Sequence, residues 1–177
     1  FALSASKKEK NNSIVIMGFI VSVIVVFLDQ LTKFLALEKL TDGLSIPILK
    51  NIFHLTLVKN TGIAFGLFRG STIILVSISF IGAIVILRYW FLKKDGLGAT
   101  VKFALFLILG GSIGNLIDRI HFGYVVDFLD FGINNLRWPA FNIADSAITI
   151  GAVLIGWKIL RVKGGRDSER QRFKESE

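Results

Sequence analysis

The sequence predicts a mainly α-helical membrane protein with four transmembrane helices, and with a small antiparallel β-sheet and a short loop or helix on one face of the membrane. Of its 177 residues 53% are hydrophobic and its mean hydropathy is +0.64, whereas soluble domains carry more charge and fewer apolar runs. Four apolar stretches are bounded by charged residues, and one connection between them alternates apolar and polar residues. These three observations define the predicted architecture.

The four apolar stretches comprise residues 14–28, 71–87, 103–117 and 146–157. Because a spanning helix needs roughly 20 mostly apolar residues, each helix must include polar neighbours at its ends. The first stretch follows "KKEK" and resembles a secretory signal peptide. It continues into "DQLTKFLALEKL" without a small-residue cleavage site, so we interpret it as a retained membrane anchor.

The connection at residues 44–69 is predicted to be rich in β-structure. Within "IFHLTLVKN" the apolar residues Phe53, Leu55 and Leu57 recur at every second position, which is the period of a strand. "KNTGIAFG", residues 59–66, then supplies turn-forming residues. We expect a small antiparallel sheet that lies on the outer leaflet.

The connection at residues 119–141 is short and rich in aromatic residues. Trp138 and Pro139 suit an interfacial anchor ahead of the last helix. Asp127 is placed to cap a short helix, "DFLDF". This connection is therefore expected to be a short outer loop or helix.

The distribution of basic residues predicts the topology. Fourteen of the 21 Lys and Arg lie in the N-terminal tail, between the second and third apolar stretches, or after residue 157. By the positive-inside rule both termini then face the cytoplasm. We expect a cytoplasmic tail at residues 1–13, a membrane domain at 14–162 and a cytoplasmic tail at 163–177, which is charged and disordered after Gly164.

Composition argues against several kinds of site. Cysteine is absent, which excludes disulfides and a cysteine nucleophile, and His54 and His121 are the only imidazoles. Neither lies in a metal-ligand motif, so we expect no metal and no cofactor. The net charge of +8 is explained by membrane topology, because the basic residues flank apolar runs and form no aromatic-interleaved patch. No nucleic-acid partner is expected.

Four aspartates, from separate segments, converge on the predicted outer side: Asp29, Asp118, Asp127 and Asp145. Each has a simple structural explanation when taken alone. Asn142 and Asp145 are three residues apart, as a helix cap and a first-turn carboxylate would be. Asp29 and Lys33 are four apart, as in an ion pair on one helix face. Gly110, Gly111 and Gly114 let helices approach closely.

Together the aspartates suggest chemistry. Carboxylates at a membrane edge are costly and point to function, and two that meet without a metal share a proton, which leaves one acid and one base. Such a pair can activate water against a peptide carbonyl. Two alternatives stay open from the residues: a small proton-coupled transporter, although such sites usually lie near the midplane of repeated halves, and a structural membrane protein that needs only caps and ion pairs.

Five segments, in order, resemble the signature blocks of the lipoprotein signal peptidases, or signal peptidase II. They are "DQLTK" (29–33), "KNTGIAFG" (59–66), "GGSIGNLIDR" (110–119), "VVDF" (125–128) and "FNIADSAITIG" (141–151). The resemblance implies a four-helix aspartyl endopeptidase of the bacterial cytoplasmic membrane, with its active site near the outer face. It would cleave a diacylglyceryl-modified prolipoprotein before the lipid-bearing cysteine.

The resemblance also implies roles for individual residues. Asp127 and Asp145 match the catalytic pair, and the substrate-binding positions fall on Asn60, Asn115, Arg119 and Asn142. Supporting roles fall on Asp29, Lys33, Gly114, Ala144 and Asp118. The last of these lies in a signature block and is open to confusion with Asp127; we expect it to form an ion pair and hydrogen bonds beside Arg119. The implied partners are the lipidated substrate, membrane lipid and globomycin-type cyclic peptide inhibitors, and a monomer is expected.

Overall fold

The computed structural model of the protein describes residues 2–62, 71–93, 97–134 and 136–175. The helices in these ranges are α1 (Ala2–Lys39), α2 (Thr72–Lys93), α3 (Ala99–Phe122) and α4 (Ile143–Glu175). Each contains a segment long and apolar enough to cross a membrane: Val15–Lys39, Ile73–Leu92, Ala99–Phe122 and Ile143–Arg161. The prediction of four transmembrane helices is confirmed. Each helix is longer than its apolar stretch and includes polar residues at its ends.

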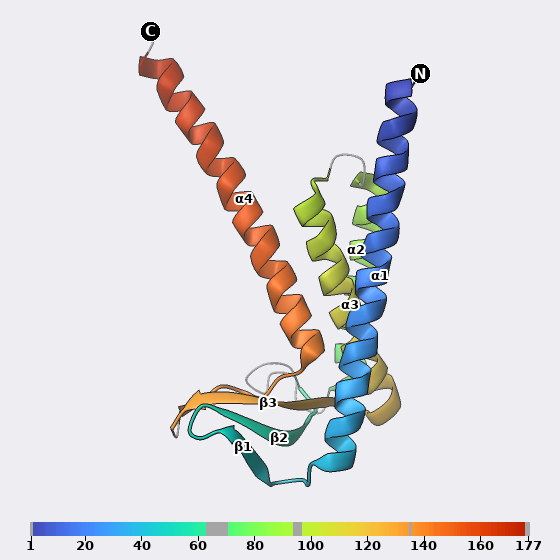
Figure 1. Ribbon diagram of the computed structural model, residues 1–177, viewed down its shortest axis with the longest axis vertical. Helices are drawn as coiled ribbons and strands as arrows, with labels where there is room; N and C mark the ends of the chain where they lie inside the picture. Colours follow the sequence, from blue (N-terminus) through green and yellow to red (C-terminus); the bar gives the residue numbers. More distant parts are fainter. Residues whose placement is uncertain (1, 63–70, 94–96, 135, 176–177) are drawn as a thin grey trace.

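Helix α3 is the centre of the bundle, since it packs against α1, α2 and α4 (Figure 1). Two adjacent glycines explain how closely the backbones approach. A Cβ on Gly110 would lie 2.9 Å from the Ser22 carbonyl oxygen of α1, and one on Gly111 would lie 2.4 Å from the Ala144 carbonyl oxygen of α4. Small residues at such crossings are typical of membrane helices. Helix α4 then diverges from α3 toward the C-terminus (Figure 1).

A four-stranded antiparallel sheet lies at one end of the helices (Figure 1). Its strands, in spatial order, are β1 (Ser45–Leu49), β2 (Phe53–Asn60), β3 (Val125–Ile133) and β4 (Leu136–Arg137). The strand predicted from the alternation after residue 52 is therefore confirmed. A buried cluster of Ala36, Leu57, Val126 and Phe128 joins the sheet to the end of α1, which fixes the sheet against the bundle.

The expectation of a short loop or helix at residues 119–141 is wrong for residues 125–133, which form strand β3. Helix α3 stops at Phe122, and Gly123 follows with φ 79°, a left-handed conformation that ends helices. The next residues are rich in β-branched and aromatic side chains, which suit a strand. Pairing with β2 then satisfies their backbone groups, as a one-turn helix would not.

The C-terminal segment also differs from expectation, because α4 continues as helix to Glu175 and is not disordered after Gly164. The residues after Gly165 include Glu, Arg, Gln and Lys, which are good helix formers. A helix that is already nucleated extends at little cost. Within "KNTGIAFG", Asn60 ends β2 and the Gly62 N–H donates to its Oδ1 at 2.9 Å; residues 63–70 lie outside the described part of the chain.

Candidate active site

A cavity of about 840 Å³ lies where α3 and α4 meet the sheet. Its polar lining includes all of the residues predicted to be catalytic and most of those predicted to bind substrate: Asn60, Asn115, Arg119, Asp127 and Asp145. The remaining wall is largely apolar and includes residues 138–141 and part of α4. A polar end inside an apolar enclosure is the usual form of a small-ligand or catalytic site.

Asp127 stands on β3 opposite Val58 of β2 and is 1% exposed. Both of its carboxylate oxygens accept hydrogen bonds from amide side chains. Asn142 Nδ2 donates to Oδ1 at 2.7 Å, and Asn60 Nδ2 donates to Oδ2 at 2.9 Å. The carboxylate is therefore held in one orientation at the cavity wall.

Asp145 lies in the first turn of α4 and also accepts at both oxygens. Asn115 Nδ2 of α3 donates to its Oδ1 at 2.7 Å, and the Asn142 backbone N–H donates to its Oδ2 at 3.3 Å. In return the Asp145 N–H donates to Asn142 Oδ1 at 2.9 Å. This is a reciprocal helix cap, so the structural interpretation of this pair is confirmed.

Asn142 nevertheless does more than cap a helix. Its Oδ1 serves the cap, while its Nδ2 reaches Asp127 Oδ1 and, at 3.2 Å, Asn115 Oδ1. One fully buried side chain thus contacts both of the candidate catalytic aspartates. The same side chain therefore caps α4 and joins the two aspartates. The interpretation of Asn142 and Asp145 as a helix cap and their interpretation as part of a site are both compatible with these contacts.

The electrostatic environment of Asp127 favours its protonated form. Its pKa is raised from the usual 3.8 to about 7, chiefly because burial penalises the charged carboxylate and next because the negative charge of Asp145 is near. Hydrogen bonds from Asn60 and Asn142 and the charge of Lys33 oppose this shift without cancelling it. The carboxyl group can therefore exchange a proton near neutral pH.

Behind this pair lies a buried ionic cluster centred on Lys33. Its Nζ lies 2.8 Å from Asp29 Oδ2 and 2.8 Å from Asp118 Oδ2, and it donates to Asn115 Oδ1 at 2.9 Å. These partners use all three ammonium protons. The predicted ion pair of Asp29 with Lys33 is confirmed. The cluster also fixes the amide of Asn115, so that its Nδ2 points to Asp145.

Asp118 belongs to the Lys33 cluster and not to the cavity wall. Its Oδ2 accepts the Val126 backbone N–H at 3.0 Å, and its Oδ1 accepts from Gln30 Nε2 at 2.9 Å. Val126 directly precedes Asp127. The ion pair expected for Asp118 therefore forms with Lys33, and its described contacts hold the strand that carries Asp127.

Arg119 lines the cavity and is weakly held by protein groups. Its guanidinium donates to the Asn115 and Gly62 carbonyl oxygens at 3.5 and 3.4 Å. Its Nε is buried and has no hydrogen-bond partner in the described residues. A buried donor without a partner is unusual, and this one belongs to a residue of the cavity wall.

The two small residues predicted to support the site lie where helices touch. A Cβ on Gly114 would lie 2.5 Å from Asp29 Oδ2 and 3.4 Å from the Ala144 Cβ. The fully buried Ala144 donates its backbone N–H to Asp29 Oδ1 at 2.9 Å. Asp29 thus joins α1 to α4 across α3, and only a glycine at 114 leaves room for its carboxylate.

Sequence reasoning missed Gln30. Its Nε2 contacts Asp29 Oδ2 and the Gly114 carbonyl oxygen, each at 3.2 Å, as well as Asp118. The available signal was a polar side chain directly after Asp29, at the end of the apolar stretch of residues 14–28. Among the described residues no group of three or more His, Cys, Asp and Glu is arranged to hold a metal.

Comparison with known proteins places this site in a family. The family model described as "Signal peptidase (SPase) II" matches residues 21–161. A lipoprotein signal peptidase of Halothermothrix orenii is 48% identical over 139 residues, which cover 78% of this chain and 92% of the relative. A lipoprotein signal peptidase of Caldanaerobacter subterraneus is 43% identical over 150 residues, which cover 84% of this chain and 99% of the relative.

Solved structures agree with this result. A bacterial membrane enzyme determined by the in meso method at 2.3 Å superposes with a TM-score of 0.77 and 33% sequence identity, covering 84% of this chain and 90% of that one. A second bacterial membrane enzyme, determined by the same method at 1.9 Å, superposes with a TM-score of 0.71 and 33% sequence identity. The match covers 81% of this chain and 92% of that one. With the family match spanning residues 21–161 and a solved structure superposing over 84% of the chain, this protein belongs to the signal peptidase II family of membrane aspartic peptidases.

Proposed function

We propose that the protein removes the signal peptide from diacylglyceryl-modified prolipoproteins, with Asp127 and Asp145 as the catalytic pair. The observation that carries this proposal is the shared contact of Asn142 with both aspartates at the wall of one cavity. The family membership of the chain and the names of its relatives, lipoprotein signal peptidases, support the substrate class.

The pair has the equipment for hydrolysis by an activated water. One carboxylate takes a proton from water as the oxygen attacks the scissile carbonyl, and the other carboxyl donates its proton to the carbonyl oxygen. The tetrahedral species then collapses, and the amino group of the lipid-bearing cysteine leaves protonated. The raised pKa of Asp127 keeps one shared proton available near neutral pH.

The neighbouring groups suit the orientation of a peptide. Asn60 and Asn115 fix the carboxylates, while Arg119 lines the cavity and its guanidinium suits a substrate carbonyl as hydrogen-bond donor. The apolar wall, including Ile148 and Ile150 of α4, can hold the hydrophobic signal segment and the acyl chains. A lipidated substrate partitions into the bilayer, so we expect it to enter laterally between helices.

The same proposal includes the topology and partners expected of the family. Both termini face the cytoplasm and the sheet faces the outside, in the bacterial cytoplasmic membrane. The enzyme acts as a monomer, and globomycin-type cyclic peptides occupy the same cavity. A proton-coupled transporter is a weaker alternative, because Asp29, Asp118, Asp127 and Asp145 cluster at one end of the bundle beside the sheet, away from its midplane.

The test is mass spectrometry of a lipidated pro-peptide after incubation with purified protein in detergent. We expect a product that begins at the lipid-bearing cysteine, and no product from Asp127→Asn. The same peptide without the diacylglyceryl group is the substrate control and should remain intact. Cleavage at another bond, or equal cleavage of the unlipidated peptide, would contradict the proposed specificity. No cleavage of either peptide by folded protein would contradict the peptidase assignment itself.

A further inference from the structure

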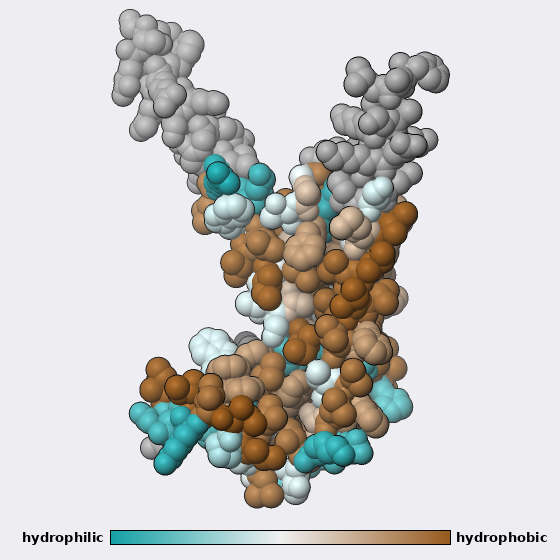
Figure 2. Space-filling model, viewed as in Figure 1, coloured by the Kyte–Doolittle hydropathy of each residue, from teal (hydrophilic) through white to brown (hydrophobic). Residues whose placement is uncertain are grey.

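Gln30 lies next to residues of α1 that are exposed on the surface of the bundle. Its neighbours Phe27, Leu28 and Leu31 are large, apolar and exposed, and Figure 2 shows mostly hydrophobic surface along α1. Gln30 itself is partly buried and belongs to the membrane-spanning segment of this helix. A polar side chain in such a segment costs free energy unless its groups are hydrogen-bonded. Its partners are therefore informative.

The amide of Gln30 turns toward α3 and meets three oxygen atoms. Its Nε2 lies 2.9 Å from Asp118 Oδ1, and 3.2 Å from both Asp29 Oδ2 and the Gly114 carbonyl oxygen. Ionised carboxylates and carbonyl groups only accept hydrogen bonds, so the nitrogen of the amide and not its oxygen must face them. Because the amide has two N–H groups for three acceptors, the shortest contact identifies Asp118 as its main partner.

The buried ionic cluster that Gln30 joins has two carboxylates for one ammonium group. Asp29 and Asp118 are both 0% exposed, and Lys33 contacts Oδ2 of each. A buried carboxylate that lacks donors is strongly destabilising. Among the described residues, the donor to Asp118 Oδ1 is Gln30. The amide therefore satisfies the carboxylate oxygen that the ammonium group does not contact.

Asp118 connects this contact to β3. Its Oδ2 accepts the Val126 backbone N–H at 3.0 Å, and Val126 directly precedes Asp127. A carboxylate that is held at both oxygens has one orientation, whereas one held at Oδ2 alone can rotate about the bond to its Cβ. Such a rotation would move the acceptor of the Val126 N–H. The donor to Oδ1, Gln30, therefore bears on the position of the strand.

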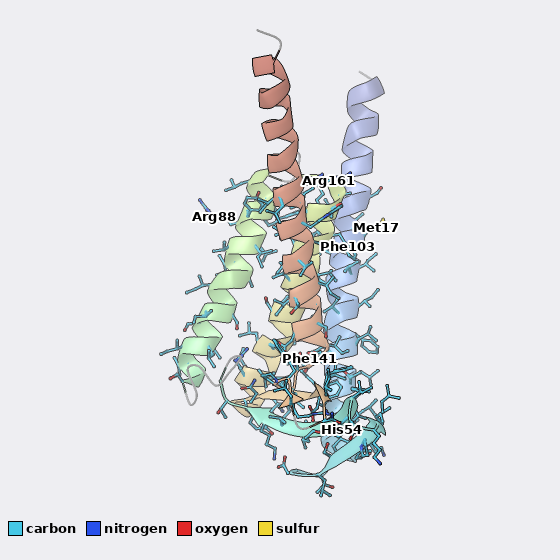
Figure 3. All side chains as sticks on the ribbon, turned by 90° about the vertical axis from the view of Figure 1, so that its left-hand side faces the viewer. Met17, His54, Arg88, Phe103, Phe141 and Arg161 are labelled. Carbon is cyan, nitrogen blue, oxygen red and sulfur yellow. The ribbon has the colours of Figure 1, made fainter. Side chains whose placement is uncertain are left out.

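These contacts lie where the helices meet the sheet. Asp29 accepts the Ala144 N–H at the start of α4, and Figure 3 shows Phe141, three residues before Ala144, at the end of the bundle beside the sheet. Gln30 does not line the cavity. It can affect the candidate active site only through the residues that it holds in place.

We propose that Gln30 is a positioning residue, whose donation to Asp118 Oδ1 fixes the carboxylate that holds Val126 and thereby keeps Asp127 at the cavity wall. The expected effect on cleavage rests on the proposed function, whereas the effect on the strand does not. The structural alternative is that Gln30 merely joins α1 to α3, as Ser22 does when its Oγ donates to the Phe106 carbonyl oxygen at 2.7 Å.

Three variants of the full chain separate these roles. Gln30→Met keeps the size of the side chain and removes the donor. Gln30→Glu keeps its shape, but the new carboxyl group can donate to Asp118 only while it holds a proton. The charged groups around it in the described residues are Asp29, Lys33 and Asp118. Ser22→Ala is the matched control, because it removes another buried hydrogen bond between α1 and α3, away from the cluster.

Cleavage of a lipidated pro-peptide is measured across the pH range of activity. We expect Gln30→Met to lower kcat on the order of 10-fold with KM unchanged, because a small displacement of a reacting group slows the chemical step. Gln30→Glu should approach the wild-type rate at acid pH and lose rate relative to the wild type as its carboxyl group ionises beside two carboxylates. Ser22→Ala should lower the melting temperature alone. Equal rates for Gln30→Glu and Gln30→Met at every pH would overturn the proposal.

Hydrogen exchange followed by mass spectrometry tests the positioning without substrate. The peptide that contains Val126 should exchange faster in Gln30→Met than in the wild type or Ser22→Ala, since the Val126 N–H loses a fixed acceptor. Unchanged exchange there in folded Gln30→Met would contradict the proposal. Gln30→Glu, compared with the wild type at low and high pH, decides the question if Gln30→Met does not fold. Absence of cleavage by the wild type would contradict the proposed function, while the exchange measurement would still decide the role of Gln30.

Discussion

The backbone N–H of Val126 donates to Asp118 Oδ2 at 3.0 Å, and Val126 directly precedes Asp127. Asp118 is thus a positioning residue for the strand of the candidate catalytic pair, with its other contacts made to Lys33 and Gln30. Sequence alone left Asp118 open to confusion with Asp127. The geometry separates them, since Asp127 lines the cavity and Asp118 does not.

The first prediction separates these aspartates by substitution. Asp127→Asn and Asp145→Asn should each abolish cleavage while the protein remains folded, because an amide retains the shape of the carboxyl group but cannot exchange the proton. Asp118→Asn should retain measurable turnover and lose stability on the order of 1 to 3 kcal/mol, as for a weakened buried polar contact. Single-turnover cleavage and thermal unfolding of the three variants measure this.

The decisive outcome is the order of the activities. Near-normal turnover in Asp127→Asn, with folded but inactive Asp118→Asn, would reassign the catalytic pair to Asp118 and Asp145.

The second prediction concerns pH. Because the pKa of Asp127 is raised to about 7 by burial and by the charge of Asp145, the pair should lose its last shared proton as the pH rises through neutrality, and the rate should fall. At much lower pH both carboxyl groups are protonated, no base remains, and the rate should fall again. The plot of rate against pH is therefore bell-shaped. The pKa values of its two limbs describe the coupled pair and not either aspartate alone.

Initial rates of lipopeptide cleavage from about pH 4 to about pH 9 test this profile. A rate that continues to rise above neutral pH would exclude a shared proton as the catalytic state.

The third prediction uses two glycines in α-helices. Gly114→Ala would place a methyl group 2.5 Å from Asp29 Oδ2, a clash that must displace a buried carboxylate, so the melting temperature and the activity should both fall. Gly82→Ala on α2 is the matched control, because a Cβ there meets nothing within 4 Å. It should be neutral or stabilising by up to about 1 kcal/mol through helix propensity. Equal melting temperatures for the two variants would contradict the packing described.

The fourth prediction concerns metal ions. Activity should persist in EDTA, because the candidate pair needs only its shared proton and the described residues offer no metal-ligand cluster. Cleavage assays before and after dialysis against EDTA measure this directly. Activity that is lost on chelation and restored by zinc would show that a metal takes part.

The fifth prediction concerns topology. Cysteines introduced at Lys8 and Gly165 should resist an impermeant thiol reagent in intact cells, whereas a cysteine at the exposed Asp42, beside the sheet, should react. The absence of native cysteines makes the background clean. Labelling at the two tails but not at position 42 would invert the proposed orientation and place the cavity on the cytoplasmic side.

Local pattern in the sequence determined the four helices, strand β2 and the cap of the last helix. Apolar runs of helical length predicted the four spanning helices, and a period of two predicted β2. The spacing of Asn142 and Asp145 predicted a helix cap, which the structure contains. Each of these features depends on residues close together in the chain, so short-range periodicity and spacing are enough to reveal them.

Only the tertiary structure decided which of those elements come into contact. Those contacts in turn distinguish the roles of the aspartates. The Ala144 N–H reaches Asp29 across 115 residues, and Lys33 reaches Asn115 across 82. Such contacts depend on how closely α1 and α4 approach α3 at its glycines, and on the register of β3 against β2. No local period encodes these distances. Strand β3 itself forms because β2 is available to pair with it. That pairing places Asp127 at the cavity wall, whereas Asp118 accepts the Val126 N–H and stays in the Lys33 cluster.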